Sequence, residues 1–375
     1  MKLFLYKILN KYIIFLFIKD FLINLFSKPI KLDYWNDIII ITSIIPFYKM
    51  KQRSQQLALS LSKIHKEKII IYYEIDFWNY KFNYKKINKN LIITNSLLKI
   101  KENLQNKNIL LLASWNVKIP TLFKLFWMKY KKIFYDYYDN FDWYDNYMWK
   151  YFLNTLNEYD KIICSAKLLK NQLLKKWYKN IIYLPNWVKF KDWFIKDKIK
   201  LNKIKNEFFW DDKKNIWFYW GIEHWLDYDL IKYIILKNKD KNFIFIWPDN
   251  WKFLKNNGIL NFKNVKVLWY IEFKELKYYS YHFDISIIPF KLNSITDAVS
   301  PVKFFEYLSQ WKPVITTWFK EILYHSEYCF ISKNKEEFNK NIYIALKKSK
   351  DLNYINKIKE YSKKFEWASL AKKIF

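Results

Sequence analysis

The segment Asp297–Thr317, DAVSPVKFFEYLSQWKPVITT, decides the fold of this 375-residue chain. An apolar strand pattern that ends in Ile287–Phe290 comes just before it. Ser300 and Pro301 predict a helix start, with the serine as N-cap and the proline at the first helical position, where its missing N–H costs nothing. The β-branched run PVITT then predicts a strand. Strand, loop, helix and strand in this order are typical of an α/β sheet, which presents polar groups at the carboxyl ends of its strands.

Two charged side chains lie on the expected helix. Lys303 and Glu306 are one turn apart and therefore share a face. Val302, Phe305 and Leu308 form an apolar face with helical spacing. The segment thus predicts an ammonium and a carboxylate side by side at the carboxyl end of a strand.

This segment resembles the donor-sugar site of retaining, nucleotide-sugar-dependent glycosyltransferases with the GT-B fold (glycosyltransferase family four). The family pattern is S-P-x-K-x-x-E-Y-L-x-x-G-K-P-V-[IV]. The residues that match it are Ser300, Pro301, Lys303, Glu306, Tyr307, Leu308, Lys312, Pro313 and Val314. The resemblance implies an α/β fold of two Rossmann-like, doubly wound domains that face each other across a cleft.

The resemblance also implies the domain organisation. An acceptor-side domain is expected at residues 37–188 and a nucleotide-sugar-binding domain at residues 189–355. A C-terminal helix, within residues 356–375, is expected to pack back towards the first domain. Lysine- and asparagine-rich stretches at 81–90 and 195–206 predict solvated connections.

Trp311 stands where the family pattern has glycine, and the composition repeats this mismatch. The chain has 2 glycines and 19 tryptophans, whereas average usage would give about 26 glycines. Trp187, Trp220, Trp247 and Trp269 also stand at glycine positions of the family segments. We hypothesise that UGA codons meaning glycine in the source organism are translated here as tryptophan. An unusually aromatic-rich protein is the alternative, and UGG codons at these positions would establish it.

The charge and the cysteines limit the kinds of partner. The formal net charge is +31, but Arg53 is the sole arginine, and the lysine-rich composition is typical of an AT-rich genome. We therefore expect no nucleic-acid partner, and we retain contact with an anionic membrane surface. Cys164 and Cys329 are far apart and the 4 histidines show no ligand spacing, so no disulfide framework, metal or cofactor is expected. A cytoplasmic location fits this cysteine usage.

Residues 1–36 are basic and very apolar, with Lys19 and Asp20 interrupting the apolar run. A spanning helix needs about 20 apolar residues, so this segment does not predict one. Three alternatives remain open: a helix that lies on the membrane surface, a helix packed on the first domain, and a misplaced start codon.

The acceptor side is expected at two places in the first domain. Gln52 and Arg53 lie in the loop after the first strand, which faces the cleft in the family. Asp136 and Asp139 end the strand pattern IFYDYYDN, and Asp136 could orient an acceptor hydroxyl or accept its proton. The alternatives are a solvated helix start for Gln52 and helix capping for Asp139.

The donor side is expected in the second domain. The strand before Trp220 and Gly221 leads into a turn whose backbone N–H groups can approach a diphosphate, and His224 could add a hydrogen bond. The family uses the loop that contains Leu268 and Tyr270 to contact the nucleotide base.

The motif supplies the remaining donor contacts. They are Ser300, Pro301, Val302, Lys303 and Glu306. By the resemblance, Glu306 holds the ribose hydroxyls and Lys303 stabilises the departing diphosphate, so the expected catalytic residues are Glu306, Lys303 and Asp136. Ala298 replaces a first glutamate that many relatives carry, and Asp297 is a neighbouring carboxylate.

These features predict an enzyme that moves a sugar from a nucleotide-sugar donor to a lipid-linked glycan or cell-surface polysaccharide precursor. A non-catalytic GT-B scaffold in a glycan-assembly complex is the second hypothesis. A nucleic-acid-binding protein ranks third, because no recognition motif accompanies the charge.

Overall fold

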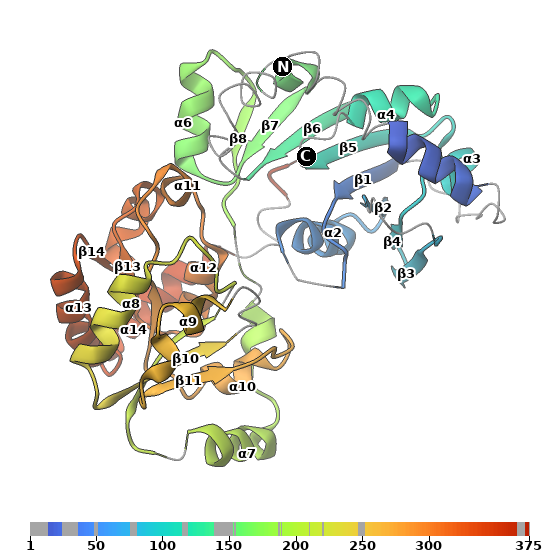
Figure 1. Cartoon of the computed structure of the whole chain (residues 1–375). Helices are drawn as coiled ribbons and strands as arrows, with labels where there is room; N and C mark the ends of the chain where they lie inside the picture. The colour runs from blue at the N-terminus through green and yellow to red at the C-terminus, as the bar shows by residue number, and fades with distance from the viewer. Residues whose placement is uncertain are drawn as a thin grey trace. The chain divides into compact units, whose positions relative to one another are not determined.

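The computed structural model describes most of the chain in two compact units (Figure 1). The described residues are 14–24, 37–48, 52–75, 81–114, 119–138, 153, 155–186, 188, 190–209, 211–219, 221–246, 252–365 and 372–374. The first unit comprises Met1–Pro185 and Trp367–Phe375, and the second comprises Asn186–Glu366.

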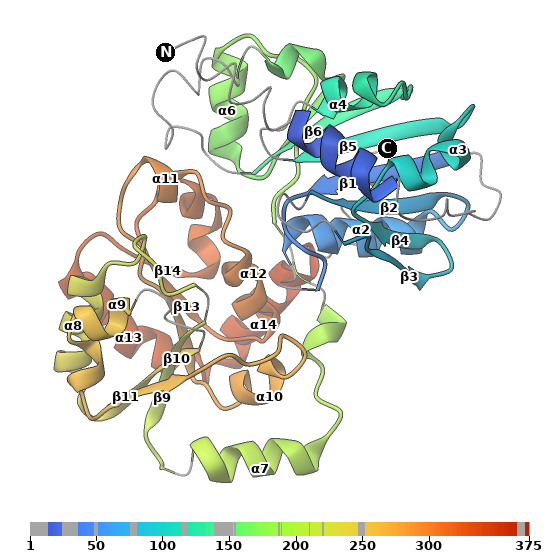
Figure 2. The same ribbon diagram turned by 45° about the vertical axis from the view of Figure 1, so that its right-hand side comes forward.

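The first unit is built on an eight-stranded sheet. In spatial order its strands are β3 (Tyr84–Asn88), β4 (Leu91–Thr94), β2 (Ile69–Glu74), β1 (Asp37–Ser43), β5 (Asn108–Ser114), β6 (Lys132–Tyr137), β7 (Lys161–Cys164) and β8 (Ile181–Tyr183). Its helices include α2 (Arg53–Ile64), α3 (Lys101–Leu104), α4 (Ile119–Leu125) and α6 (Lys167–Lys175), with 3-10 turns at Leu98–Ile100 and Leu156–Glu158. The central strands are apolar and buried along their length, as in a parallel sheet covered on both faces. Figures 1 and 2 show α2 on one face and α3 and α4 on the other.

The second unit is built on a six-stranded sheet whose paired strands all run parallel. In spatial order these are β11 (Val265–Leu268), β10 (Lys241–Ile246), β9 (Lys214–Tyr219), β12 (Ile285–Ile288), β13 (Val314–Thr317) and β14 (Phe330–Ser332). Its helices are α7 (Lys198–Phe208), α8 (Tyr228–Lys237), α9 (Phe253–Asn256), α10 (Leu276–Ser280), α11 (Ser294–Asp297), α12 (Val302–Ser309), α13 (Lys335–Lys348) and α14 (Leu352–Lys363), with 3-10 turns at Phe190–Trp193, Ile259–Asn261 and Lys320–Tyr328. Both sheets change winding direction partway across, so the expected fold class of two doubly wound α/β domains is confirmed.

Two segments expected to be connections are regular elements, and these expectations were wrong. Residues 84–88 form β3, the antiparallel edge strand beside β4. Exposed edge strands commonly carry lysine, which discourages pairing with other chains. Residues 198–208 form α7, which the Asp197 side chain caps by accepting a hydrogen bond from the Lys200 N–H at 2.9 Å. Lysine-rich exposed faces therefore concealed both elements.

The helix of the motif begins one residue later than expected. Pro301 is the N-cap of α12, which starts at Val302. Ser300, which was expected to cap the helix, instead accepts a hydrogen bond at Oγ from the Asn186 N–H (3.2 Å). The serine hydroxyl thus joins the start of the second unit to the start of α12.

Three tryptophans adopt backbone conformations that favour glycine. Trp127, Trp177 and Trp311 have φ of 56°, 65° and 61°. Each follows a helix, and the N–H of the residue after it reaches back to a carbonyl five positions earlier: Met128 to Phe123 (2.9 Å), Tyr178 to Leu173 (3.2 Å) and Lys312 to Tyr307 (3.2 Å). This is the Schellman motif, whose left-handed position glycine usually fills. The geometry at these sites suits glycine, in line with the codon hypothesis, which stays a prediction.

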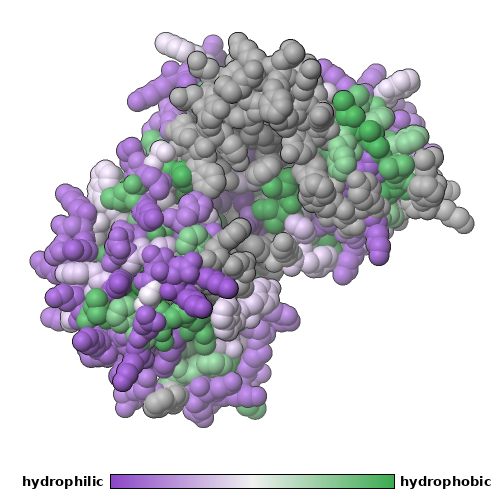
Figure 3. Space-filling view, in the orientation of Figure 1, coloured by the Kyte–Doolittle hydropathy of each residue, from purple (hydrophilic) through white to green (hydrophobic). Residues whose placement is uncertain are grey.

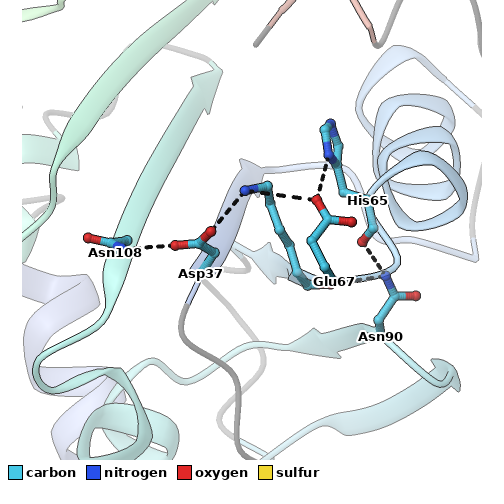
Figure 4. A network of polar contacts seen from close by, with 6 residues as sticks. Asp37, His65, Glu67, Asn90 and Asn108 are labelled. Atoms are coloured by element: carbon cyan, nitrogen blue, oxygen red, sulfur yellow. Dashed lines mark hydrogen bonds and ion pairs between the residues drawn. The ribbon is translucent and has the colours of Figure 1, made fainter.

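The amino edge of the first sheet is closed by a polar network (Figure 4). Lys68 Nζ lies 3.0 Å from Asp37 Oδ2, and Asn108 Nδ2 donates to the other oxygen of Asp37 at 2.9 Å. These hydrogen bonds, with that from Lys68 first, lower the pKa of Asp37 below its ordinary value. Asn90 Nδ2 also donates to the carbonyls of His65 and Lys68. The network joins the starts of β1 and β5 to the turn before β2.

A helix over residues 14–24 packs on the α3 and α4 side of the first sheet (Figures 1 and 2), where Phe17 stacks on Phe126 just after the end of α4. Asp20 is buried and accepts hydrogen bonds from the Ser96 hydroxyl and from the Leu97 N–H. Burial raises the pKa of Asp20 to about 6. These contacts join the helix to the first unit. Within the described residues, no helix has the length and apolar character needed to cross a membrane.

Candidate active site

The candidate donor site lies at the carboxyl edge of the second sheet. The chain passes from β9 outward to β10 and β11 and then returns to β12 on the other side of β9. Loops that leave neighbouring strands in opposite directions open a crevice, which is where ligands bind in doubly wound sheets. Tyr219 ends β9 and Ile288 ends β12, and α12 follows shortly after. The motif therefore lies at this switch point.

Glu306 is the centre of the site. It projects from α12 and is only 3% exposed. Lys303 Nζ lies 2.9 Å from Glu306 Oε2, and the Tyr219 hydroxyl donates to the same oxygen. The Lys303 ammonium also lies 4.5 Å from the centre of the Tyr219 ring. A buried carboxylate is thus held by one cation and one phenol.

The arrangement leaves the carboxylate able to bind more hydrogen-bond donors. An ionised carboxylate has about four acceptor positions on its two oxygens, whereas Lys303 and Tyr219 both approach Oε2. Burial, and after it the charge of Glu306, holds the pKa of Tyr219 well above its ordinary value. The phenol therefore remains a donor at neutral pH.

Tyr219 is a site residue that the sequence analysis missed. It is buried, and Tyr307 of α12 supports it through two backbone contacts: the Tyr219 N–H donates to the Tyr307 hydroxyl (3.1 Å), which in turn donates to the Tyr219 carbonyl (3.2 Å). One signal could have identified it, because Tyr219 is the last residue of β9, immediately before the predicted turn.

Asn186, the first residue of the second unit, holds the start of α12 in place through hydrogen bonds. Asn186 Nδ2 donates to the Ser300 carbonyl at 2.7 Å, in addition to the backbone contact with the serine hydroxyl. Ser300 and Pro301 are buried and Val302 is partly exposed. Ser300 thus orients the helix that carries Lys303 and Glu306. Among Ser300, Pro301 and Val302, Val302 is the most accessible.

The other predicted donor residues lie at the same sheet edge. Gly221 follows β9, and a Cβ there would come within 3.3 Å of Glu223 and Trp225 side-chain atoms. His224 is exposed, and its ring meets that of Trp225 with centroids 5.1 Å apart. Trp220 lies outside the described residues.

The predicted base-contacting loop follows β11 at this edge. Leu268 is the last residue of the strand. Tyr270 is 56% exposed, so its ring is accessible to a ligand. The parallel sheet places this loop and the turn after β9 at one edge.

The position of the missing first glutamate is buried and apolar. Ala298 is 1% exposed. The neighbouring Asp297 forms an ion pair with Lys320 (Oδ2 to Nζ, 2.7 Å) and accepts a hydrogen bond from the Lys320 N–H. Asp297 therefore has a structural partner at this position.

The first unit brings two of the predicted acceptor-side residues together. Arg53 Nε lies 2.9 Å from both Asp136 oxygens, and Arg53 Nη2 lies 2.9 Å from Oδ1. Both side chains are at least 95% buried, with exposures of 5% and 2%. Arg53 Nη1 also donates to the Pro185 carbonyl at 3.1 Å. The pair joins the first residue of α2, the end of β6 and Pro185, which ends the longer of the two segments of the first unit.

The remaining acceptor-side residues differ in what the structure shows. Gln52 precedes α2 as its N-cap, and its N–H donates to Gln55 Oε1 at 3.1 Å. Asp139 lies outside the described residues. The acceptor role of Asp136 stays a prediction, and its carboxylate is held by Arg53.

Across the described part of the chain, no group of three histidine, cysteine or acidic side chains could hold a metal ion. Cys164 and Cys329 are buried free thiols whose pKa values burial raises above the ordinary value.

Comparisons with known proteins agree with this architecture. No protein-family model matches the chain. Over 103 residues it is 34% identical to the "Putative teichuronic acid biosynthesis glycosyltransferase TuaH" of Bacillus subtilis, a match that covers 26% of this chain and 25% of that relative. The chain thus spans only about a quarter of the length of this curated relative.

Solved structures match over most of the chain. Sucrose-phosphate synthase from Thermosynechococcus elongatus superimposes with a TM-score of 0.68 and 11% identity, covering 90% of this chain and 97% of that one. Anabaena HepE, solved in complex with UDP-glucose, superimposes with a TM-score of 0.65 and 10% identity, covering 90% and 98%. These identities establish the fold alone. The chain has the GT-B fold of these glycosyltransferases.

Proposed function

We propose that the protein is a glycosyltransferase that takes a sugar from a nucleotide-sugar donor. The observation that carries this proposal is the buried Glu306 carboxylate, which Lys303 and Tyr219 hold at the switch point of the second sheet. The partial match to a putative teichuronic acid biosynthesis glycosyltransferase supports the same reaction class.

In this proposal Glu306 accepts hydrogen bonds from the two ribose hydroxyls of the donor. An ammonium has three donor positions. Lys303 can therefore keep its contact with Glu306 while another N–H points to the departing diphosphate. Preorganised positive charge at the leaving group is a large source of rate in such transfers. The turn that begins at Gly221 supplies backbone N–H groups nearby in the sequence.

We further propose a retaining reaction without a metal or other cofactor, on an acceptor that is a lipid-linked glycan or a cell-surface polysaccharide precursor. The enzyme would work on the cytoplasmic side of the membrane. Asp136 and Arg53 are the candidates for the acceptor side, together with Gln52 and Asp139. The TuaH match supports a cell-envelope polysaccharide as the product class.

The donor site is tested by the melting temperature of the protein with UDP, GDP, ADP, CMP and their sugars. A ligand that binds only the native state raises the midpoint by mass action. We expect one nucleotide to raise it and Glu306→Gln to remove that rise.

Glu360→Gln is the matched control. Glu360 forms an ion pair with Lys363 at the same i,i+3 spacing, but on an exposed surface of the same unit. It should leave the rise unchanged. A rise that survives Glu306→Gln would contradict the proposed site, because the carboxylate would then make no contact with the nucleotide.

A non-catalytic scaffold is the second candidate function. Ala298 is buried where many family members have a glutamate, and this departure favours it. A scaffold would show no rise with any nucleotide, or a rise without consumption of the nucleotide sugar.

A further inference from the structure

The helix over residues 14–24 has the reverse of the usual polarity of a surface helix. Its exposed residues are all apolar: Ile14, Ile18, Phe21 and Leu22, with exposures of 51%, 49%, 48% and 37%. Their spacing of four, three and one places them on one face. The charged residues Lys19 and Asp20 are instead 2% and 1% exposed.

Specific polar contacts fix which face points outward. On the inner face, Asp20 accepts hydrogen bonds from Ser96 and Leu97. At the end of the helix, Lys99 Nζ donates to the Asn24 carbonyl at 2.8 Å. Rotating the helix to bury the apolar face would break these contacts and leave buried polar groups unpaired, which is costly. The outward apolar face is therefore held in place by the inner polar one.

The apolar surface continues beyond this helix. Phe17 stacks on Phe126, with ring centroids 5.4 Å apart. Leu125, the neighbour of Phe126 at the end of α4, is 37% exposed. Figure 3 shows hydrophobic side chains gathered in the upper right of the view, over the dark-blue helix and α4 of Figure 1. A contiguous exposed apolar patch on a soluble domain marks an interaction surface.

The charge of the chain favours an anionic partner for the patch. Lys124 is exposed beside Leu125, while Glu102 is an exposed acidic residue of the neighbouring α3. The sequence that precedes the helix, residues 1–13, carries three lysines and no acidic residue, and the formal net charge of the chain is +31. Apolar side chains beside an excess of lysine suit a surface of acyl chains and anionic headgroups.

We propose that the outward face of the 14–24 helix, with Leu125 of α4, docks the first unit on an anionic lipid membrane. The side chains of Ile14, Ile18, Phe21 and Leu22 enter the boundary between headgroups and acyl chains, and Lys124 binds the anionic headgroups. The inner polar contacts keep the helix in its place on the domain during docking. This surface is independent of whether the second unit binds a nucleotide.

Co-sedimentation with lipid vesicles tests this proposal on the full chain. We expect the protein to bind vesicles of phosphatidylcholine and phosphatidylglycerol and to bind pure phosphatidylcholine far more weakly. The double variant Ile18→Ser/Phe21→Ser should lose at least about tenfold in partition coefficient, because two apolar side chains leave the lipid. Both residues are half exposed, so the variant should keep the circular dichroism spectrum of the original protein.

The matched control is Ile199→Ser/Leu352→Ser, which removes two apolar side chains from the second unit, where they are 85% and 76% exposed. It should bind vesicles like the original protein. Absence of binding to anionic vesicles, or equal binding by the two double variants, would overturn the proposal. A dimer in light scattering that only Ile18→Ser/Phe21→Ser dissociates, without vesicle binding, would assign the patch to a second copy of the chain instead.

Discussion

Replacing Trp127 or Trp177 by glycine should stabilise the first unit. The left-handed conformation costs a residue with a Cβ about 1–2 kcal/mol, and glycine loses about 0.5–1 kcal/mol through its greater backbone freedom in the unfolded chain. The net gain is therefore about 1 kcal/mol per site. The two indoles are 87% and 90% exposed, so removing them sacrifices little buried surface.

Replacing Trp311 by glycine should stabilise the protein less than the replacements at Trp127 and Trp177. It is 40% exposed, and Lys359 Nζ lies 4.3 Å from the centre of its ring. A cation–π contact of this kind is worth about 0.5–1 kcal/mol, which glycine would forfeit. This offsets much of the gain in backbone energy.

The measurement is thermal unfolding of each glycine variant beside the alanine variant of the same position. Alanine removes the indole and keeps the Cβ, so the difference between the two isolates the backbone term. In a unit of this size about 1 kcal/mol raises the melting temperature by about 2–4 °C. Trp269→Gly is a further control, because Trp269 is exposed and outside the left-handed region. Equal midpoints for the glycine and alanine variants at 127 and 177 would refute the assigned backbone conformation.

Three further changes test the contacts described above. Tyr219→Phe removes the hydroxyl that donates to Glu306. A hydrogen bond to a charged group is worth about 1.5–3 kcal/mol, so nucleotide affinity in titration calorimetry should fall by about tenfold or more. Unchanged affinity would exclude a positioning role for Tyr219. Asp136→Asn leaves the buried Arg53 guanidinium without its counter-charge and should destabilise the first unit by about 3–5 kcal/mol in urea unfolding. The double replacement Arg53→Met/Asp136→Leu removes both charges and should recover much of this loss. If it recovers nothing, the loss of stability comes from packing and not from the unpaired charge. For Asp20 the folded pKa of about 6 lies above its ordinary value of 3.8, so the folded state holds the proton more tightly than the unfolded state does. The resulting stability is fully present below about pH 4. It falls by about 3 kcal/mol as the pH rises through 6. Asp20→Asn should abolish that dependence in unfolding curves recorded from pH 4 to 7, and a slope equal to that of the original protein would assign it to other groups.

The sequence predicted the elements that carry the motif, because their signals are local. Strand, helix and strand around Lys303 and Glu306 follow from apolar periodicity, and both residues fall on α12 as expected. The contact of Glu306 with Tyr219 depends on which strands are neighbours, and β9 lies beside β12 although 65 or more residues separate them. No local pattern carries that information.

The sequence analysis also did not predict which charged residues, far apart in the chain, form ion pairs. Arg53 and Asp136 were both expected on the acceptor side, but their separation of 83 residues hid that they bind each other. The charged pair Lys19–Asp20 was interpreted as an interruption of an apolar run. In the fold it forms part of the buried side of the helix.

The Arg53 contacts bear on how this protein evolves under its base composition. One side chain binds both oxygens of Asp136 and, through a third nitrogen, the Pro185 carbonyl. Lysine offers a single nitrogen and cannot reproduce this planar fork. Mutational drift towards AT-rich codons exchanges arginine for lysine wherever a point charge suffices, and here such an exchange would break three buried contacts at once. At Arg53 the codon bias towards lysine is therefore opposed by the need for a planar guanidinium, and selection on stability alone suffices to keep arginine at this position.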